Sequence, residues 1–344
     1  MLTRRQRNGL RVGADRAAQA PSVHNTQPWR FDLHQDRLEL WLDRTRQLTA
    51  ADPQGRELVM SVGAALLNAR VGIASVHQAC SVDRFPDPAQ PDLAAVVRPA
   101  LADAEPGLAA LDPLVPLRRS NRSDYAGAAP TEVVELLRAA AAAEDVVLHP
   151  FDESQQRALA RLVHVARAVQ ECDEAYEREL RIWTSRPARL HDGMRREPTG
   201  TARTGSAAVP LRDFGAGPVL GDDASGGPRG QESVLVLATR GDTPGHWLRA
   251  GEALERVLLE VVRLGWQAGL VTQPVEVPAT RTDLAKMLPP GLEPQAVLRV
   301  GRAEPPHGIA PRRCTADVLR DLTAFPEAGP GPAGTSASGG QPRS

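Results

Sequence analysis

Hydrophobic residues in the first third of the chain follow two spacings, and each spacing predicts a different kind of element. Two short segments, Trp29–Leu33 and Leu38–Leu42, are apolar and separated by polar residues, which predicts a β-hairpin. Residues 94–101 predict a further strand, and residues 3–19 a short helix. A long amphipathic helix is predicted where apolar residues recur at helical spacing, at Leu58, Val62, Ala65, Leu66, Ala69, Ile73 and Val76.

A second series of helices and strands follows. A helix is predicted over 131–143 with Thr131 as its N-cap, then a strand over 146–151 and a helix over 154–171. Ser233–Thr239 has the continuous apolar character of a buried strand, and residues 296–300 predict the last one. Between these two strands an apolar helix is marked by Leu254, Val257, Leu258, Val261, Val262 and Leu264.

The two series share a faint internal repeat. Gly-Ala-Ala-Leu-Leu at 63–67 opens a helix that precedes Ala-Val-Val-Arg at 95–98, and Gly-Glu-Ala-Leu at 251–254 opens one that precedes Ala-Val-Leu-Arg at 296–299. A single match of this kind also arises by chance. The similar order and spacing nevertheless favour a duplication, with one half in residues 1–115 and the other in 116–325.

The composition narrows the class of protein. Of the 344 residues, 42% are hydrophobic, enough for a full core, and a net charge of −1 gives no nucleic-acid footprint. Cys80, Cys172 and Cys314 lie far apart and form no group with zinc spacing, so a reduced, metal-free protein is expected. No segment reads as a membrane span or a signal peptide, so we expect a soluble cytoplasmic protein without a membrane partner.

Two regions have little periodicity. Residues 186–231 are crowded with Gly, Pro, Arg and Asp, which predicts a long loop or lid. Residues 326–344 are rich in Gly, Pro and Ser, which predicts a disordered tail.

The first candidate for chemistry is Pro-Ser-Val-His-Asn-Thr-Gln-Pro-Trp at 21–29. It places several hydrogen-bonding side chains on a backbone stiffened by proline at both ends, which suits the polar edge of a planar heteroaromatic ring. The alternative is a surface turn that caps a strand, and without further knowledge that interpretation is the simpler one. His24 could touch a ligand, although a histidine in a polar loop is more often a solvated turn residue.

The second candidate is Arg-Arg-Ser-Asn-Arg at 118–122. In an extended conformation Arg118, Ser120 and Arg122 project to one side and could converge on an anion such as a phosphate. The alternative is a solvated basic run before a helix. The basic pair Arg312-Arg313 could complete an anion site if the chain returns there.

Together these segments resemble the nitroreductase family. The family carries an Arg-x-Ser-x-basic motif for the FMN phosphate, a Pro-Ser-x-x-Asn-x-Gln-Pro-Trp motif at the isoalloxazine, a late Pro-x-Glu loop and a C-terminal basic pair. The resemblance extends from about residue 16 to residue 319. Carried over residue by residue, it assigns FMN binding to Pro21, Ser22, Val23, Asn25, Gln27, Arg118, Arg119, Ser120, Arg122, Pro274, Val275, Glu276, Arg312 and Arg313.

The order of the motifs departs from an ordinary member, in which the arginine motif comes first and two subunits share two FMN sites. Here it follows the Gln-Pro-Trp motif by about a hundred residues. Each half therefore keeps what the other lost, as in the Acg-type branch of the family. This resemblance implies an α+β, nitroreductase-like fold whose two halves form an intramolecular pseudo-dimer around one FMN, with no obligate oligomer required.

The resemblance implies a flavin-dependent oxidoreductase that takes hydride from NAD(P)H and passes it to a nitro compound, a quinone or a similar small aromatic acceptor. Positive charge near N1 of the ring stabilises reduced flavin, a role open to Arg122. The rival interpretation is a storage protein whose lid covers the FMN and prevents turnover, and a third is a vestigial site on a structural fold.

Overall fold

The computed structural model describes residues 2–123, 125–194, 232–304 and 311–323. Helices and strands are mixed, and the α+β class predicted from the sequence is confirmed. The predicted lid falls mostly on 195–231 and the predicted tail on 326–344, both outside the described residues.

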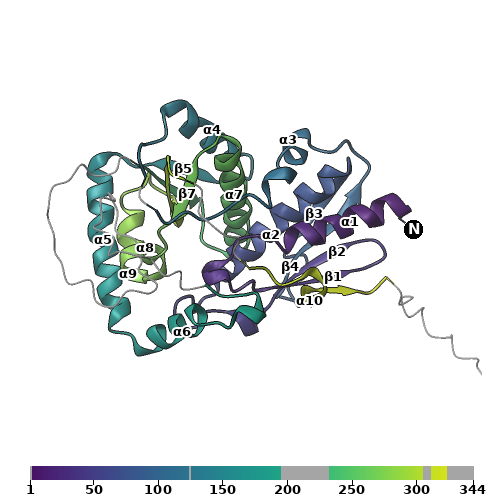
Figure 1. The fold of residues 1–344 in the computed structure, drawn as a ribbon, viewed down its shortest axis with the longest axis horizontal. Helices are drawn as coiled ribbons and strands as arrows, with labels where there is room; N and C mark the ends of the chain where they lie inside the picture. Colours follow the sequence, from purple (N-terminus) through teal and green to yellow (C-terminus); the bar gives the residue numbers. More distant parts are fainter. Residues whose placement is uncertain (1, 124, 195–231, 305–310, 324–344) are drawn as a thin grey trace, which may run out of the picture.

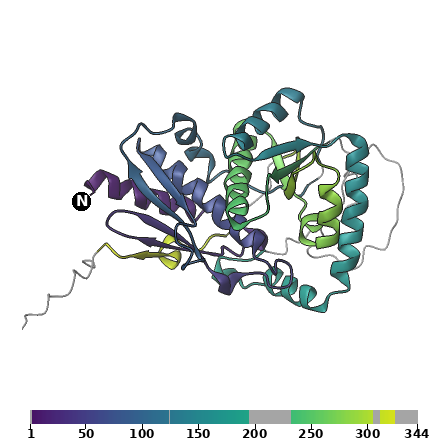
Figure 2. The ribbon, with the colours of Figure 1, turned by 180° about the vertical axis from the view of Figure 1, so that it is seen from behind.

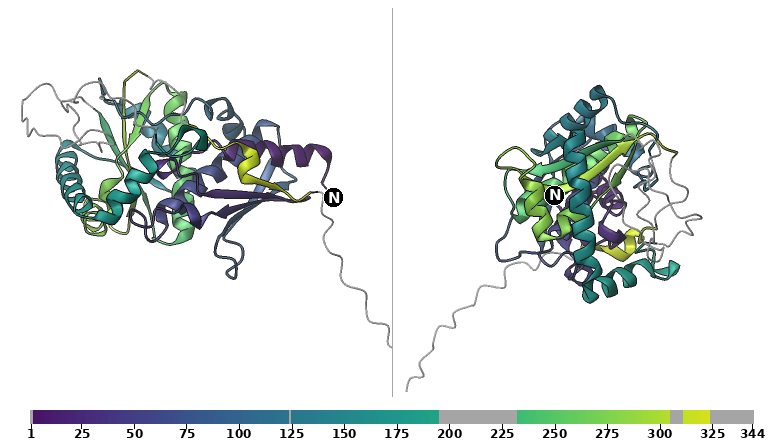
Figure 3. Two further views of the ribbon diagram at one scale, coloured as in Figure 1. Left: turned by 60° about the horizontal axis from the view of Figure 1, so that its bottom comes forward. Right: turned by 90° about the vertical axis from the view of Figure 1, so that its left-hand side faces the viewer.

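The first sheet has the strand order β3-β4-β2-β1-β9. Strands β1 (Trp29–Leu33) and β2 (Leu38–Leu42) form the predicted hairpin, with Phe31 opposite Leu40. Strand β4 (Leu93–Ala100) matches the third predicted strand, and β3 (Ala79–Arg84) pairs with it. The short strand β9 (Leu319–Asp321) runs parallel to β1, so the C-terminal segment returns to the sheet of the N-terminal half, as Figure 3 shows.

The second sheet has the strand order β5-β6-β8-β7, and all its pairs are antiparallel. Its strands are β5 (Val147–Pro150), β6 (Ser233–Thr239), β7 (Gln267–Leu270) and β8 (Glu293–Gly301). Strand β6 is buried along nearly its whole length, as its unbroken apolar sequence predicts.

Two twenty-residue helices, α2 (Arg56–Ser75) and α7 (Pro244–Arg263), lie side by side between the two sheets (Figures 1 and 2). Helix α2 is the one described helix long and apolar enough to cross a membrane, but 89% of its apolar window is buried inside the protein. The other described α-helices are α1 (Arg4–Ala17), α3 (Pro106–Ala109), α4 (Thr131–Ala142), α5 (Glu153–Glu171), α6 (Glu174–Thr184), α8 (Gln273–Glu276), α9 (Pro278–Ala285) and α10 (Thr315–Val318).

Two expectations about helix starts are wrong. Pro130, not Thr131, is the N-cap of α4, because Pro130 has extended dihedral angles and Thr131 is already helical. The sequences at 63–67 and 251–254 lie inside α2 and α7 and do not open them. The start of α7 is marked by Pro244, since proline fits the first helical turn, where the backbone N–H has no partner.

Helices α2 and α7 touch through two glycines. A Cβ atom on Gly63 would lie 2.1 Å from the carbonyl oxygen of Leu248, and one on Gly251 would lie 2.0 Å from that of Met60. Each glycine therefore faces the residue three positions before the other glycine. At both points a glycine of one helix lies directly against the backbone of the other helix, with no side chain between them. The two helices can therefore approach very closely.

This contact predicts that Gly251→Ala destabilises the fold, because the added methyl meets a carbonyl that no rotamer change can move. We expect a loss of about 1–3 kcal/mol in the free energy of unfolding, the usual cost of overpacking. The matched control is Gly245→Ala in the first turn of α7, where the nearest atom would lie 3.8 Å away. The control should be neutral or stabilising in urea denaturation, and equal midpoints for both variants would contradict the prediction.

Candidate functional site

A cavity opens where α2, α7, the second sheet and the Pro21–Pro28 segment meet. It brings together residues from three of the four predicted motifs: Pro21, Ser22 and Val23 from the first, Ser120 and Arg122 from the second, and Val275 from the third. His24, for which the sequence analysis left contact with a ligand open, also lines the cavity. The sequence did not predict the other lining residues, which are Glu57, Met60, Ser61, Ala64, Leu254, Leu270, Val271, Thr272, Gln273, Gln295 and Ala296.

The Pro21–Pro28 segment has an unusual backbone. His24, Asn25 and Gln27 have φ angles of 44°, 55° and 51°, in the left-handed region that side chains other than glycine rarely adopt. Such strain costs of order 1–3 kcal/mol per residue and persists only where surrounding contacts enforce it. Here Ser22 supplies one of those contacts, because its hydroxyl accepts a hydrogen bond of 2.8 Å from the Gln27 backbone N–H.

The amides of Asn25 and Gln27 do not line the cavity. Asn25 donates through Nδ2 to the carbonyls of Gly193 and Pro311, both at 3.0 Å, and its Oδ1 accepts from Arg312 at 2.9 Å. Gln27 donates to the carbonyl of His191 and accepts from the Arg313 backbone N–H, both at 2.9 Å. These two residues hold two remote segments of the chain against the cavity wall.

His24 differs from the expected solvated turn residue. Its side chain is buried, with 8% exposed, and it lines the cavity. The left-handed backbone turns it inward, which a reading of the sequence as a polar surface loop does not anticipate.

The Arg118–Arg122 segment lies against β7. The Asn121 backbone N–H donates to the Ala268 carbonyl at 2.7 Å, and the Tyr125 hydroxyl donates to the Asn121 carbonyl at 2.9 Å. Ser120 and Arg122 therefore face the cavity. Arg118 points elsewhere and is buried, with Nε 3.5 Å from a carboxylate oxygen of Glu255 on α7.

Arg118, Arg119 and Arg312 form what we call the arginine cluster. Burial, followed by repulsion from Arg118, lowers the pKa of Arg312 to about 9, while Glu255 acts in the opposite direction. Burial likewise lowers the pKa of Arg119, with Arg118 the second cause. Arg118 is buried and the other two are partly buried, and such a group of like charges is unfavourable by itself, so it fits a site that receives an anion.

Arg313 lies apart from this cluster. Its guanidinium donates to the Asp317 carbonyl at 3.0 Å, and burial, followed by repulsion from Arg46, lowers its pKa. In the third motif only Val275 reaches the cavity. Pro274 accepts a hydrogen bond from Thr280 through its carbonyl, and Glu276 accepts one from Gln170.

The floor of the cavity depends on a buried arginine that the sequence analysis missed. Arg56, with 4% exposed, donates to the Gln295 carbonyl at 2.6 Å, to the Val275 carbonyl at 3.3 Å and to the Glu57 carboxylate at 3.2 Å. All three partners line the cavity, and they come from β8, α8 and α2. Burial lowers the pKa of Arg56, and the charge of Glu57 is the largest opposing effect.

One signal could have found these residues in the sequence. Arg56 and Glu57 begin a largely apolar helix, and Gln295 lies in a largely apolar strand. Charged or amide side chains at positions whose periodicity places them in the core are seldom there without a partner or a function.

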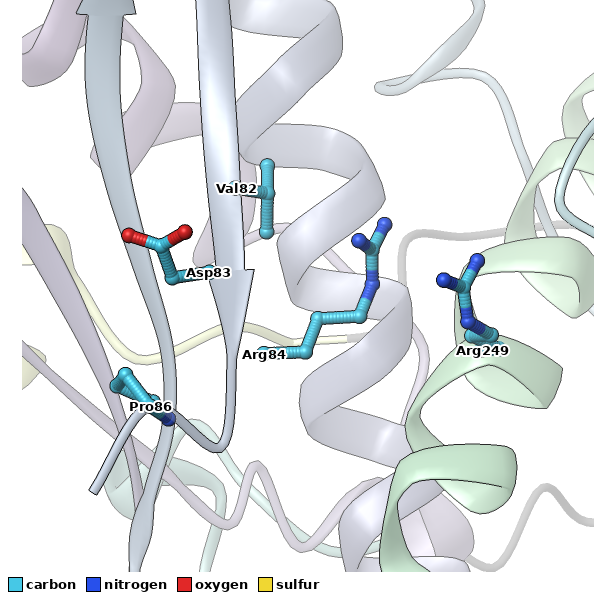
Figure 4. Close-up of a pocket in the computed structure, with 5 residues that line it drawn as sticks. All are labelled: Val82, Asp83, Arg84, Pro86 and Arg249. Atoms are coloured by element: carbon cyan, nitrogen blue, oxygen red, sulfur yellow. The ribbon is translucent and has the colours of Figure 1, made fainter.

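A second, open hollow lies between β3 and α7 (Figure 4) and is lined by Val82, Asp83, Arg84, Pro86 and Arg249. Its two arginines already have partners. Arg84 pairs with the buried Glu252 at 2.7 Å, and Arg249 pairs with Asp145 at 2.8 Å. We therefore assign the functional site to the first cavity.

Comparison with known proteins agrees with the motifs. No family model matches the chain. A protein of Mycobacterium tuberculosis named "Putative NAD(P)H nitroreductase Rv3131" is 38% identical over 297 residues, which cover 83% of each chain. "Putative NAD(P)H nitroreductase acg" of the same organism is 31% identical over 311 residues, 88% of this chain and 92% of its own.

The chain belongs to the nitroreductase family. Within that family it is of the Acg type, as the order of its motifs predicts. The chain is also similar to the uncharacterized protein Rv3127 of the same organism, which is 30% identical over 334 residues, 91% of this chain and 93% of its own.

The role of Arg56 in this nitroreductase family member is testable through stability. Arg56→Met leaves the Glu57 carboxylate and two buried carbonyls without their donor, and breaking a buried pair costs about 3–5 kcal/mol. The control is Arg157→Met on α5, where an exposed pair with Glu153 contributes about 0.3–0.5 kcal/mol. Urea denaturation should show a much lower midpoint for Arg56→Met only. Similar midpoints would show that the floor contacts contribute little.

Proposed function

We propose that this nitroreductase family member is an FMN-dependent NAD(P)H oxidoreductase. The observation that carries the proposal is the convergence of Ser22, Arg122 and Val275 in one cavity, although their motifs lie far apart in the sequence. The names of the relatives add support, since two of them are called NAD(P)H nitroreductases. Those names also favour an oxidoreductase over a flavin-storage protein.

The residues present fit a flavin. Apolar side chains from both central helices and the second sheet offer surface for a planar ring, namely Met60, Ala64, Leu254, Leu270, Val271 and Ala296. Polar groups at the rim, including Ser22, Thr272 and Gln273, suit the hydrogen-bonding edge of that ring. The arginine cluster, with Ser120 and Arg122, suits a dianionic phosphate.

The two halves, 1–115 and 116–325, are proposed to form an intramolecular pseudo-dimer with one FMN. The reciprocal glycine contact between α2 and α7 supports a two-fold relation between the halves. The second half also extends two segments onto the first. Glu179 of α6 accepts hydrogen bonds from the backbone N–H groups of Ala50 and Ala51, and β9 pairs with β1.

In this proposal the flavin supplies hydride transfer, and the chain supplies binding, orientation and charge. Arg122 places positive charge at the cavity, which favours binding of the FMN phosphate. His24 and Glu57 line the cavity with polar side chains, so they are the candidates for orienting a nitro compound or quinone-like acceptor. We further propose that the protein works in the cytoplasm, where NAD(P)H is supplied.

The central test is cofactor content and reduction. The purified protein, saturated with FMN and freed of excess, should release one FMN per chain on denaturation. Adding NADPH or NADH without oxygen should bleach the flavin absorbance, and a quinone should restore it. A ratio near two would refute the single-site pseudo-dimer. Flavin that dithionite reduces but neither nicotinamide reduces would favour storage over catalysis.

A second test concerns the phosphate. Arg122→Ala removes a charge-assisted contact worth about 1.5–3 kcal/mol, which corresponds to roughly a tenfold to hundredfold weaker affinity for FMN. Because Arg122 is exposed, the fold should tolerate the change. Riboflavin, which lacks the phosphate, should bind both proteins equally in fluorescence titrations, and the exposed Arg138→Ala is the control. Equal losses for FMN and riboflavin would place Arg122 at the ring and not at the phosphate.

A further inference from the structure

A buried carboxylate lies next to arginines that are proposed to bind the phosphate. A negative charge is unexpected there, because it would repel a phosphate. Glu255 on α7 is fully buried, and its Oε2 is 3.5 Å from Nε of Arg118. Neither carboxylate oxygen of Glu255 has a hydrogen-bond partner among the described residues. A buried charge without hydrogen bonds is costly, so its presence beside Arg118 and Arg312 needs an explanation.

The carboxylate lies near the end of the cavity. Met60 and Ala64 line the cavity from α2, and Asn68 follows Ala64 by one helical turn. Asn68 is fully buried, and neither of its amide atoms makes a hydrogen bond within the described part of the chain. Leu254, the neighbour of Glu255, lines the cavity from α7. Asn68 of α2 and Glu255 of α7, both without hydrogen bonds among the described residues, thus lie next to the helical turns that line the cavity.

We propose that Glu255 is the internal counter-ion of the arginine cluster, and that it takes up one proton from solvent when a phosphate group binds there. In the free protein the carboxylate offsets part of the positive charge. A bound phosphate dianion takes over that task and repels the carboxylate, so the carboxyl becomes neutral and can donate a hydrogen bond. The inference rests on the proposed function, because it concerns the phosphate of the same FMN.

The charges around Glu255 support a proton change near neutral pH. Burial raises the pKa of Glu255 to about 7, against the lowering effects of Arg118, Asn68 and Arg312 in that order. The Asn68 amide approaches the carboxylate without reaching hydrogen-bond geometry. A folded-state pKa above the ordinary value means that the ionised form predominates only above about pH 7, and a nearby dianion raises the pKa further.

Several other charged residues on α7 and near it form ion pairs of their own. Their pairs are Glu252 with Arg70 and Arg84, Arg256 with Glu105 and Glu144, and Asp112 with Arg16. Within the arginine cluster, Arg312 has a pKa of about 9 and also gains protons when an anion binds. At pH 8 it is already mostly protonated, so its contribution is small beside that of Glu255.

Calorimetry of FMN binding at pH 8 tests the proposal, in buffers of different ionisation enthalpy such as Tris and HEPES. The FMN phosphate is already dianionic there, since its second pKa is about 6. The dependence of the observed enthalpy on the buffer gives the number of protons taken up. We expect nearly one proton for the wild-type protein with FMN, and none with riboflavin.

Glu255→Gln, of nearly the same shape, should bind FMN with little proton uptake, and Glu260→Gln on the same helix should behave as wild type. FMN bound by the wild-type protein without proton uptake would overturn the inference even if no Glu255 variant folds. Uptake that persists in Glu255→Gln would also overturn it. Absence of any FMN binding would instead overturn the proposed function, and the inference with it.

Discussion

The close approach of α2 and α7 is the constraint on which the rest of the structure depends. With no side chain at Gly63 or Gly251, each helix rests on a backbone carbonyl of the other. The residues one turn away then face a common space. Met60 and Ala64 of α2 and Leu254 of α7 all line the cavity, so the spacing of the helices sets its width. A wider crossing would separate the walls that hold a planar ring.

A second consequence of this crossing is that charged side chains are buried between the helices as groups of ion pairs. Arg70 of α2 bridges Glu252 of α7 and Glu144 after α4, and these partners hold its pKa above the ordinary value. Removing one member of such a set would leave an uncompensated buried charge, which costs more than the set contributes. The arginine cluster with Glu255 differs, because its positive charge exceeds its negative charge. That imbalance supports the proposal that the cluster binds an anion and is not only a structural ion-pair network.

Periodicity predicted most of the fold. The β1–β2 hairpin, α2, α5 and β6 appear within a residue or two of their predicted bounds, since each buries one continuous apolar face or run. The strands β3 and β7 escaped prediction because β3 is only partly buried and β7 spans only four residues, Gln267–Leu270. Strand β9 escaped because its pairing with β1 joins the two ends of the chain, and no local pattern records such a contact.

The site was predictable to the extent that its chemistry lies in contiguous motifs. Ser22, Arg122 and Val275 belong to such motifs and do meet in the cavity. Arg56, Glu57, Gln295 and Glu255 are isolated polar residues in apolar elements, and their function exists only once α2, α7 and β8 are packed together. Short motifs therefore indicate the proposed ligand class, whereas most of the groups proposed to position and neutralise that ligand come together only through packing. The proton balance of the site follows from that crossing, because only packing places a carboxylate against the arginine cluster.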